Sequence, residues 1–146
     1  MYLSRAEGIN SLREWLIAWN EHDLIKVMSF VHENIVFENF TGAIIVGKEH
    51  LQKAWTPWFL NHGNFRFTEE EIFFDTDEQK MLLKWRLEWP SAEKLFKGKH
   101  EIRRGVDVIH FEDGKVIQKH SYSKTTIQIE ELLIALRADY LLTQTI

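Results

Sequence analysis

The sequence contains no cysteine in its 146 residues, which excludes disulfide bonds, thiolate catalysis and cysteine–zinc sites. Basic runs are also missing, because no stretch of Lys and Arg exceeds two residues and the net charge is −4. A nucleic-acid groove or an anionic membrane surface requires a basic stripe, so we expect neither partner. The N-terminus lacks an apolar signal core and no apolar run approaches about 18 residues, which leaves a cytoplasmic location as the expectation.

Proline and glycine are scarce as well, with two and seven copies, and no repeat or low-complexity segment divides the chain. This composition predicts a single domain spanning residues 1–146, a length that can bury a sizeable core. Aromatic residues are abundant instead, since they make up 13% of the chain and include six Trp and ten Phe. Such a content favours a core or a pocket that is walled by rings.

Helical periodicity dominates the first 60 residues. Residues 4–20 repeat apolar side chains at three- and four-residue steps, and Ser4 and Glu7 occupy the positions of a capping box. Asp23 is placed to cap a short second helix, and a third helical pattern follows Gly47. Between the second and third helices, "NIVFENF" has the composition of a short strand.

From Phe65 the period changes to two, which indicates strands in "FRFTEEEIFFD", "MLLKWRLEW" and the hairpin "RRGVDVIHFEDGKV". After this core, at about residues 4–125, the Ile and Leu spacing of residues 127–142 predicts an added C-terminal helix. Helices followed by antiparallel strands are typical of an α+β fold. We expect the N-terminal helices to pack in the concave face of a curved, mostly antiparallel sheet, as a cone or α+β barrel.

Asp107 stands within the apolar strand of that hairpin and is the candidate catalytic residue. In a pocket, a carboxyl group donates a hydrogen bond when protonated and acts as a base when ionised. The alternative is a structural aspartate paired with Arg103, Lys119 or His120. A two-residue turn sets Asp107 opposite His120, whereas a three-residue turn with a glycine bulge sets it opposite Lys119.

The order of these elements resembles the nuclear-transport-factor-2-like cone fold, in its SnoaL-like and ketosteroid-isomerase-like branch. Four segments carry the resemblance and match in order and spacing to about Thr125: "AWNEHD", "VFENFTG", "GKEHLQKAW" and "VDVIHFEDGKV". The fold serves enzymes and non-enzymes alike, so the resemblance implies a fold more directly than an activity. It also implies a homodimer through the outer face of the sheet, and it favours the three-residue turn, which directs Ser121 inward.

Ketosteroid isomerases of this branch combine an aspartate base with an oxyanion hole made of a tyrosine and a protonated aspartate. By position, the resemblance places the oxyanion aspartate at Asp107, the tyrosine at Trp15, the base at Asn39 and a supporting tyrosine at Trp55. An amide accepts no proton at neutral pH and an indole has only one N–H donor. We therefore expect no steroid isomerisation of the usual kind, although Trp15 and Trp55 retain a donor for a ligand oxygen.

Strand alternation directs only one of Glu38 and Asn39 into the pocket unless a bulge intervenes. The candidate ligand contacts of the chain are Trp15, Asn39, Trp55, Glu38, Lys119, His120 and Ser121. Epoxide hydrolases of this fold use Arg-x-Asp on a strand plus a further Asp. Here Arg103 stands four residues from Asp107 and the later position is Ser121, so this chemistry is disfavoured. The seven histidines show no metal-binding spacing, so no metal site is expected.

The sequence thus predicts a SnoaL-like protein that binds a small, largely apolar, oxygen-bearing molecule in an aromatic pocket. If the protein is an enzyme, we expect proton transfer of the isomerase, cyclase or dehydratase type without a cofactor. The alternative is a non-catalytic ligand-binding or interaction module that kept the cone and lost the base.

Overall fold

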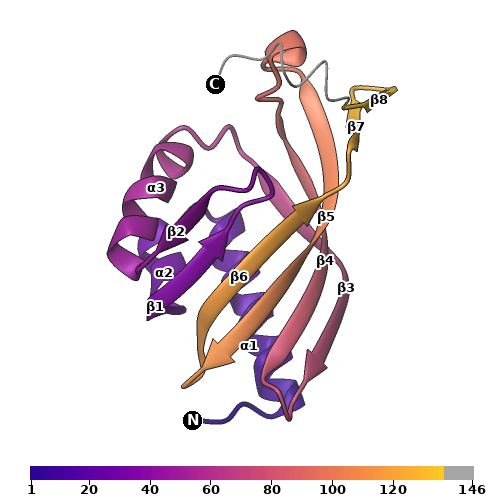
Figure 1. Ribbon diagram of the computed structural model, residues 1–146. Coiled ribbons are helices and arrows are strands. Elements are labelled where there is room, and N and C mark those ends of the chain that lie inside the picture. Colours follow the sequence, from indigo (N-terminus) through magenta and orange to yellow (C-terminus); the bar gives the residue numbers. More distant parts are fainter. Residues whose placement is uncertain (137–146) are drawn as a thin grey trace.

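A computed structural model of the chain describes residues 1–136, in which three α-helices pack against one curved, open sheet of eight strands. The helices are α1 (Arg5–Asn20), α2 (Leu24–Ser29) and α3 (Lys48–Leu60), with a short 3-10 turn η1 (Lys94–Phe96). The strands are β1 (Val31–Glu38), β2 (Ile44–Val46), β3 (Arg66–Asp75), β4 (Lys80–Pro90), β5 (His100–Glu112), β6 (Lys115–Ser123), β7 (Thr126–Ile129) and β8 (Leu132–Ala135). Helix α1 lies along the concave face of the sheet, and α2 and α3 lie beside it (Figure 1).

The sheet runs in the order β2-β1-β6-β5-β4-β3, and β7 joins it by pairing with both β5 and β8. All neighbouring strands are antiparallel except β1 and β6, which run parallel. The expected α+β architecture, with helices in the concave face of a curved and mostly antiparallel sheet, is therefore confirmed.

The start of α1 is fixed by the capping box that the sequence predicts. The Ser4 hydroxyl accepts a hydrogen bond from the Glu7 N–H at 3.1 Å, and the Ser4 N–H donates to the Glu7 carboxylate at 2.8 Å. These hydrogen bonds lower the pKa of Glu7, because they favour its ionised form. Two donors at the helix end are satisfied in this way, which sets where α1 begins.

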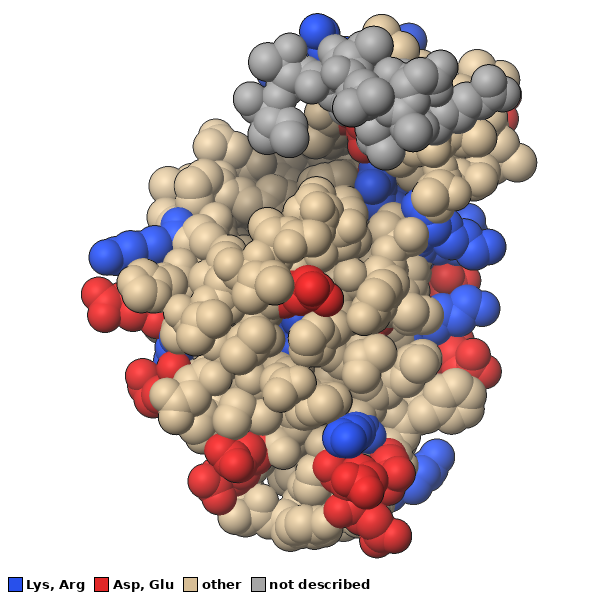
Figure 2. Space-filling model, viewed as in Figure 1, with Lys and Arg blue, Asp and Glu red and all other residues tan. Residues whose placement is uncertain are grey.

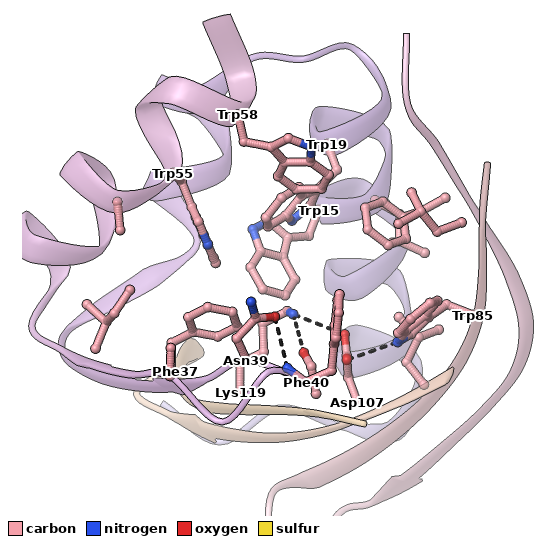
Figure 3. Close-up of a pocket in the computed structure, with 18 of the residues that line it drawn as sticks. Trp15, Trp19, Phe37, Asn39, Phe40, Trp55, Trp58, Trp85, Asp107 and Lys119 are labelled. Carbon is pink, nitrogen blue, oxygen red and sulfur yellow. Dashed lines mark hydrogen bonds and ion pairs between the residues drawn. The ribbon is translucent and has the colours of Figure 1, made fainter. Parts of the chain in front are cut away.

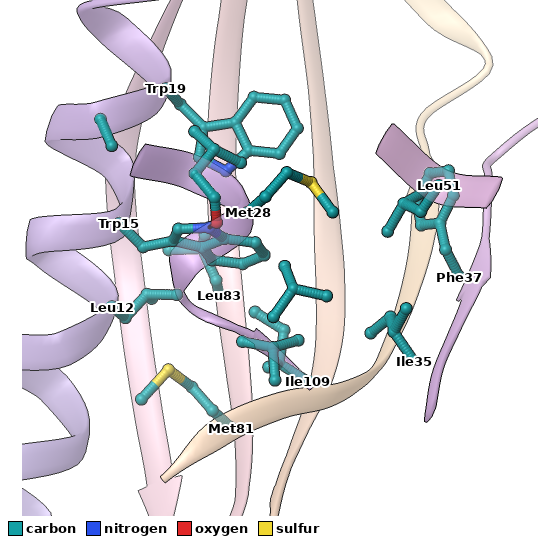
Figure 4. Packing of buried hydrophobic residues seen from close by; sticks show 14 of the residues in the cluster. Leu12, Trp15, Trp19, Met28, Ile35, Phe37, Leu51, Met81, Leu83 and Ile109 are labelled. Atoms are coloured by element: carbon teal, nitrogen blue, oxygen red, sulfur yellow. Dashed lines mark hydrogen bonds between the residues drawn. The ribbon is translucent and has the colours of Figure 1, made fainter. Parts of the chain in front are cut away.

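The core lies between α1 and the concave face of the sheet. Leu12 and Trp15 of α1 face Met81 and Leu83 of β4 and Ile109 of β5 (Figure 4), and none of the five side chains is more than 2% exposed. Alternate residues of "MLLKWRLEW" point inward because successive side chains of a strand leave opposite faces. The same alternation on β5 brings Asp107 to the inner face.

The hairpin of β5 and β6 differs from both expected registers. Its turn holds two residues, Asp113–Gly114, with positive φ angles of 51° and 73°, but a bulge near the turn then shifts the register by one residue. Asp107 therefore pairs with Ser121, and neither His120 nor Lys119 stands directly opposite it. The bulge nevertheless places Lys119 and Ser121 on the inner face, which is the face that the three-residue turn predicted for Ser121.

The C-terminal segment is not the helix expected over residues 127–142. Residues 126–135 form the β7–β8 hairpin, and residues 137–142 lie outside the described part of the chain. Strand β5 extends beyond the end of β6, and β7 pairs with the backbone groups left there, as in the pair of Glu101 with Ile129. Ile127 and Ile129 alternate into the interior, whereas Leu133 remains exposed. Short apolar segments fit the period of a helix and that of a strand alike. Here the segment forms a strand because the free edge of β5 offers backbone groups for pairing.

Truncation of one side chain in this hairpin distinguishes a strand from a helix. Ile127 is 1% exposed and Leu133 is 74% exposed, so Ile127→Ala should lower the free energy of unfolding by roughly 2–4 kcal/mol. Leu133→Ala, the matched control, should change it by less than about 0.5 kcal/mol. Chemical denaturation measures both values, and a larger loss for Leu133→Ala would support the helix instead.

Candidate functional site

A cavity of about 300 Å³ lies between the helices and the concave face of the sheet. Aromatic and aliphatic side chains form most of its wall, and Figure 3 shows how they face one another. The polar lining residues are few: Asn39, Asp107, Lys119 and Ser121. A largely apolar cavity with a small set of converging polar groups is the usual form of a small-molecule site.

The helices supply the tryptophans of the wall. Trp15 and Trp19 come from α1, and Trp55 and Trp58 come from α3, so that four indoles lie across the cavity from Asp107 and Lys119 (Figure 3). The ring centroids of Trp19 and Trp55 are 4.7 Å apart in an edge-to-face arrangement. Edge-to-face contacts of this kind stabilise the packing of the rings, which form a surface against which a flat apolar ligand can pack.

Asp107 is buried in the floor of the cavity, with 5% of its surface exposed. Its Oδ1 accepts a hydrogen bond from the indole N–H of Trp85 at 2.9 Å. Gly105 makes this contact possible, because a Cβ atom there would lie 2.5 Å from the Trp85 ring and 2.1 Å from the Tyr122 carbonyl oxygen. Glycine in a strand interior often marks such a close approach, and here it lets the indole reach the carboxylate.

Lys119 is the charged partner of Asp107. Its Nζ lies 3.2 Å from Asp107 Oδ2 and donates to the Ser121 hydroxyl at 2.8 Å. The ammonium also lies 5.0 Å from the centre of the Phe37 ring, within cation–π range. Both side chains are mostly buried, at 14% exposure for Lys119 and 7% for Asp107. The ammonium and the indole N–H thus contact the two carboxylate oxygens of Asp107, one each.

Some donors of the cavity wall have no acceptor within residues 1–136, among them the side-chain amide N–H₂ of Asn39 and the indole N–H of Trp55. The Oδ1 of Asn39 accepts a hydrogen bond from the Phe40 N–H at 2.9 Å. The amide nitrogen of Asn39 therefore faces the cavity (Figure 3). Trp15 differs, because its indole N–H donates to the Val27 carbonyl at 3.0 Å. Asn39 and Trp55 are therefore available to a ligand oxygen, and Trp15 contributes only its ring.

The structure brings Trp15, Asn39, Trp55, Lys119 and Ser121 together with Asp107 around one cavity. It does not bring Glu38 and His120 there. These two side chains pair with each other at 3.3 Å on the outer face of the sheet.

Arg103, another partner considered for Asp107, is engaged elsewhere. Its guanidinium contacts Glu101 at 3.0 Å and Glu93 at 2.8 Å. Among the three proposed partners of Asp107, only Lys119 is in contact with it.

Trp85 is a contact of Asp107 that the sequence did not predict. The alternation of β4 is equally typical of a core residue, and Trp85 is only 3% exposed. Gly105 was the available signal, because a glycine inside a strand indicates that another group approaches closely, and in the structure it pairs with Trp85. Within residues 1–136, no three His, Asp or Glu side chains are grouped to hold a metal ion, and no helix is both long and apolar enough to cross a membrane.

Comparison with known protein families gives one match. The sequence model of the SnoaL-like domain family matches residues 12–119. A comparison with curated proteins found no match.

Solved structures share the fold. An NTF2-like protein of unknown function from Mesorhizobium loti is 22% identical, with a TM-score of 0.66 over 85% of this chain and 99% of the other. SalBIII is an epoxide hydrolase/cyclase-like enzyme with a role in pyran ring formation in the polyether salinomycin. It is 13% identical, with a TM-score of 0.73 over 85% of this chain and 96% of the other. An LEH-like epoxide hydrolase from M. tuberculosis is 16% identical, with a TM-score of 0.67 over 82% and 84%.

The ion pair in the cavity floor should be visible in stability measurements. Removing one member of a buried pair leaves the other charge without a partner. Lys119→Met should therefore lower the free energy of unfolding by about 2–3 kcal/mol. This loss is slightly smaller than the loss for a fully buried pair, because Lys119 is partly exposed. The double variant Asp107→Asn/Lys119→Met should lose less than the sum of the two single losses. Urea denaturation completes the cycle, and additivity within about 0.5 kcal/mol would show that the two groups do not interact.

Proposed function

The chain belongs to the SnoaL-like family, and from this premise we propose that it binds a small, largely apolar molecule with a carbonyl-type oxygen and transfers a proton of that molecule. The observation that carries the proposal is the position of the Asp107–Lys119 pair at the floor of an aromatic cavity. The pair combines a proton acceptor and a positive charge at one side of an otherwise apolar site, which is the combination that proton transfer beside a carbonyl requires.

The size of the cavity limits the ligand. An engineered cavity of about 150 Å³ binds benzene, and this cavity has about twice that volume at about 300 Å³. A molecule of roughly two fused rings therefore fits among the tryptophans.

The proposed chemistry divides between Asp107 and the donors around the cavity. The Asp107 carboxylate takes a proton from the carbon next to the carbonyl group, and the electron pair of the broken C–H bond moves into an enolate. Lys119 has three N–H donors and uses two of them on Asp107 and Ser121. Its third donor, with those of Asn39 and Trp55, is available to the enolate oxygen. Asp107 then returns the proton to the same carbon or to another one, which completes an isomerisation without a cofactor.

A non-catalytic binding module is the second candidate. Both carboxylate oxygens of Asp107 already have partners, Trp85 on one and Lys119 on the other. Contacts of this kind also stabilise a purely structural aspartate. In that case the cavity would bind its ligand without removing a proton.

Exchange of hydrogen for deuterium in a simple aromatic ketone separates the two candidates. The methyl protons of 2-acetylnaphthalene lie next to its carbonyl group, and NMR in deuterated buffer follows their loss. The protein should accelerate this exchange, and Asp107→Asn should reduce the acceleration by about 10²-fold or more, because a positioned base contributes that much. Circular dichroism checks that the variant is folded. Binding of the ketone without accelerated exchange would support the binding module.

We also propose that the outer face of the sheet joins two copies of the chain. Exposed apolar side chains occur along this face, among them Ile44, Val46, Phe73 and Tyr122, each more than half exposed. Charged side chains gather towards its rim in Figure 2. Burial, and then the charges of Lys80 and His120, lower the pKa of His110, which favours the neutral imidazole on this face. The β7–β8 hairpin pairs at the edge of β5 and does not cover the face.

Sedimentation tests the dimer. At micromolar concentration, the protein should sediment at about twice the 17.4 kDa of one chain. Val108→Asp places a charge at the middle of the outer face and should shift the population to the monomer, because like charges meet across a two-fold axis. Ile25→Asp is the control, since Ile25 on α2 is 80% exposed and lies away from this face. A wild-type species near 17.4 kDa would contradict the dimer.

A further inference from the structure

We infer that the Asp107–Lys119 pair determines the charge of the ligand, so that the pocket takes an uncharged carbonyl compound and rejects the carboxylate of the same shape. This inference rests on the proposed function of the cavity and adds to it the class of ligand. It makes Lys119 and Asp107 the specificity-determining residues of the site, in addition to any role in proton transfer.

The charges around the cavity cancel. Asp107 and Lys119 are the only charged residues that line it among the described residues, and their 3.2 Å contact makes them a neutral pair. Arg103 adds no free positive charge. Its guanidinium lies over the Phe40 ring, 5.1 Å from the ring centre, and it is paired with both Glu101 and Glu93.

An anionic ligand would upset this balance. A carboxylate inside the cavity would compete with Asp107 for the ammonium of Lys119 and would leave one negative charge without a partner in an apolar site, which is strongly unfavourable. Aromatic rings lie close to the pair, with Phe37 and Trp19 at 5.0 and 6.0 Å from the ammonium. Such an apolar wall screens charges less than bulk water does, so the repulsion between two carboxylates is stronger there.

The free hydrogen-bonding groups fit an uncharged acceptor. Asn39 and Trp55 present donors to the cavity without an acceptor within residues 1–136, and Lys119 retains one N–H. A carbonyl oxygen accepts from such donors without bringing a charge. The apolar rings, which form most of the wall, require no charge on the ligand either.

Two probes of nearly equal shape test the inference. We would titrate 2-acetylnaphthalene and 2-naphthoate into the full-length protein at neutral pH and follow binding by ligand-detected NMR. The ketone should bind at least about tenfold more tightly than the carboxylate, because like charges in a desolvated site repel strongly. Asp107→Asn should reverse this order, because it leaves Lys119 as an unpaired cation that pairs with 2-naphthoate.

A matched control separates the local pair from the overall charge. Glu38→Gln removes one negative charge, as Asp107→Asn does, but from the outer face of the sheet. It should keep the preference for the ketone. If Asp107→Asn does not fold, Asp107→Ser replaces it, because it also leaves Lys119 as an unpaired cation and should reverse the order in the same way.

The outcomes are distinct. Failure of both probes to bind the wild-type protein would overturn the proposed function, and this inference with it. Binding of 2-naphthoate as tightly as the ketone by the wild-type protein would overturn the inference alone. An equal change of selectivity in Glu38→Gln and Asp107→Asn would also overturn it, since the effect would then come from net charge.

Discussion

The ion pair between Asp107 and Lys119 is the interaction on which the site depends. A charge inside an apolar wall is stable only with a close partner and further hydrogen bonds. Trp85 and Ser121 provide these bonds at 2.9 and 2.8 Å. The partners come from three neighbouring strands, β4, β5 and β6, so the register of the sheet determines whether the pair forms. The long strands of the cone thus serve the site as well as the core.

Much of the fold could be predicted from the sequence, because local patterns agree with it. The capping box of Ser4 and Glu7 fixes the start of α1, and strict alternation in "MLLKWRLEW" fixes the inner face of β4. The C-terminal segment could not be predicted in the same way. Its Ile and Leu residues fit both a helix and a strand, and the choice depends on the free edge of β5, which exists only in the folded sheet.

The sequence indicates which residues line the cavity better than it indicates which contacts they make. Asp107, Asn39 and Trp55 were placed by their positions in the family pattern, and all three line the cavity. The partner of Asp107 depended on a one-residue bulge in β6, for which the sequence carries no clear signal. The same bulge directs His120 outward to Glu38 and brings Lys119 inward. A change of one residue in register thus decides between a histidine dyad and a lysine ion pair.

A crystal structure with 2-acetylnaphthalene bound would show whether the ion pair and the free donors form one binding site. The naphthalene rings should pack against Trp19 and Trp55. The carbonyl oxygen should lie within about 3.2 Å of a nitrogen of Lys119, Asn39 or Trp55, the range of a hydrogen bond. A ligand bound outside this cavity, or one inside it with the carbonyl group directed away from all three nitrogens, would show that these groups do not form one site.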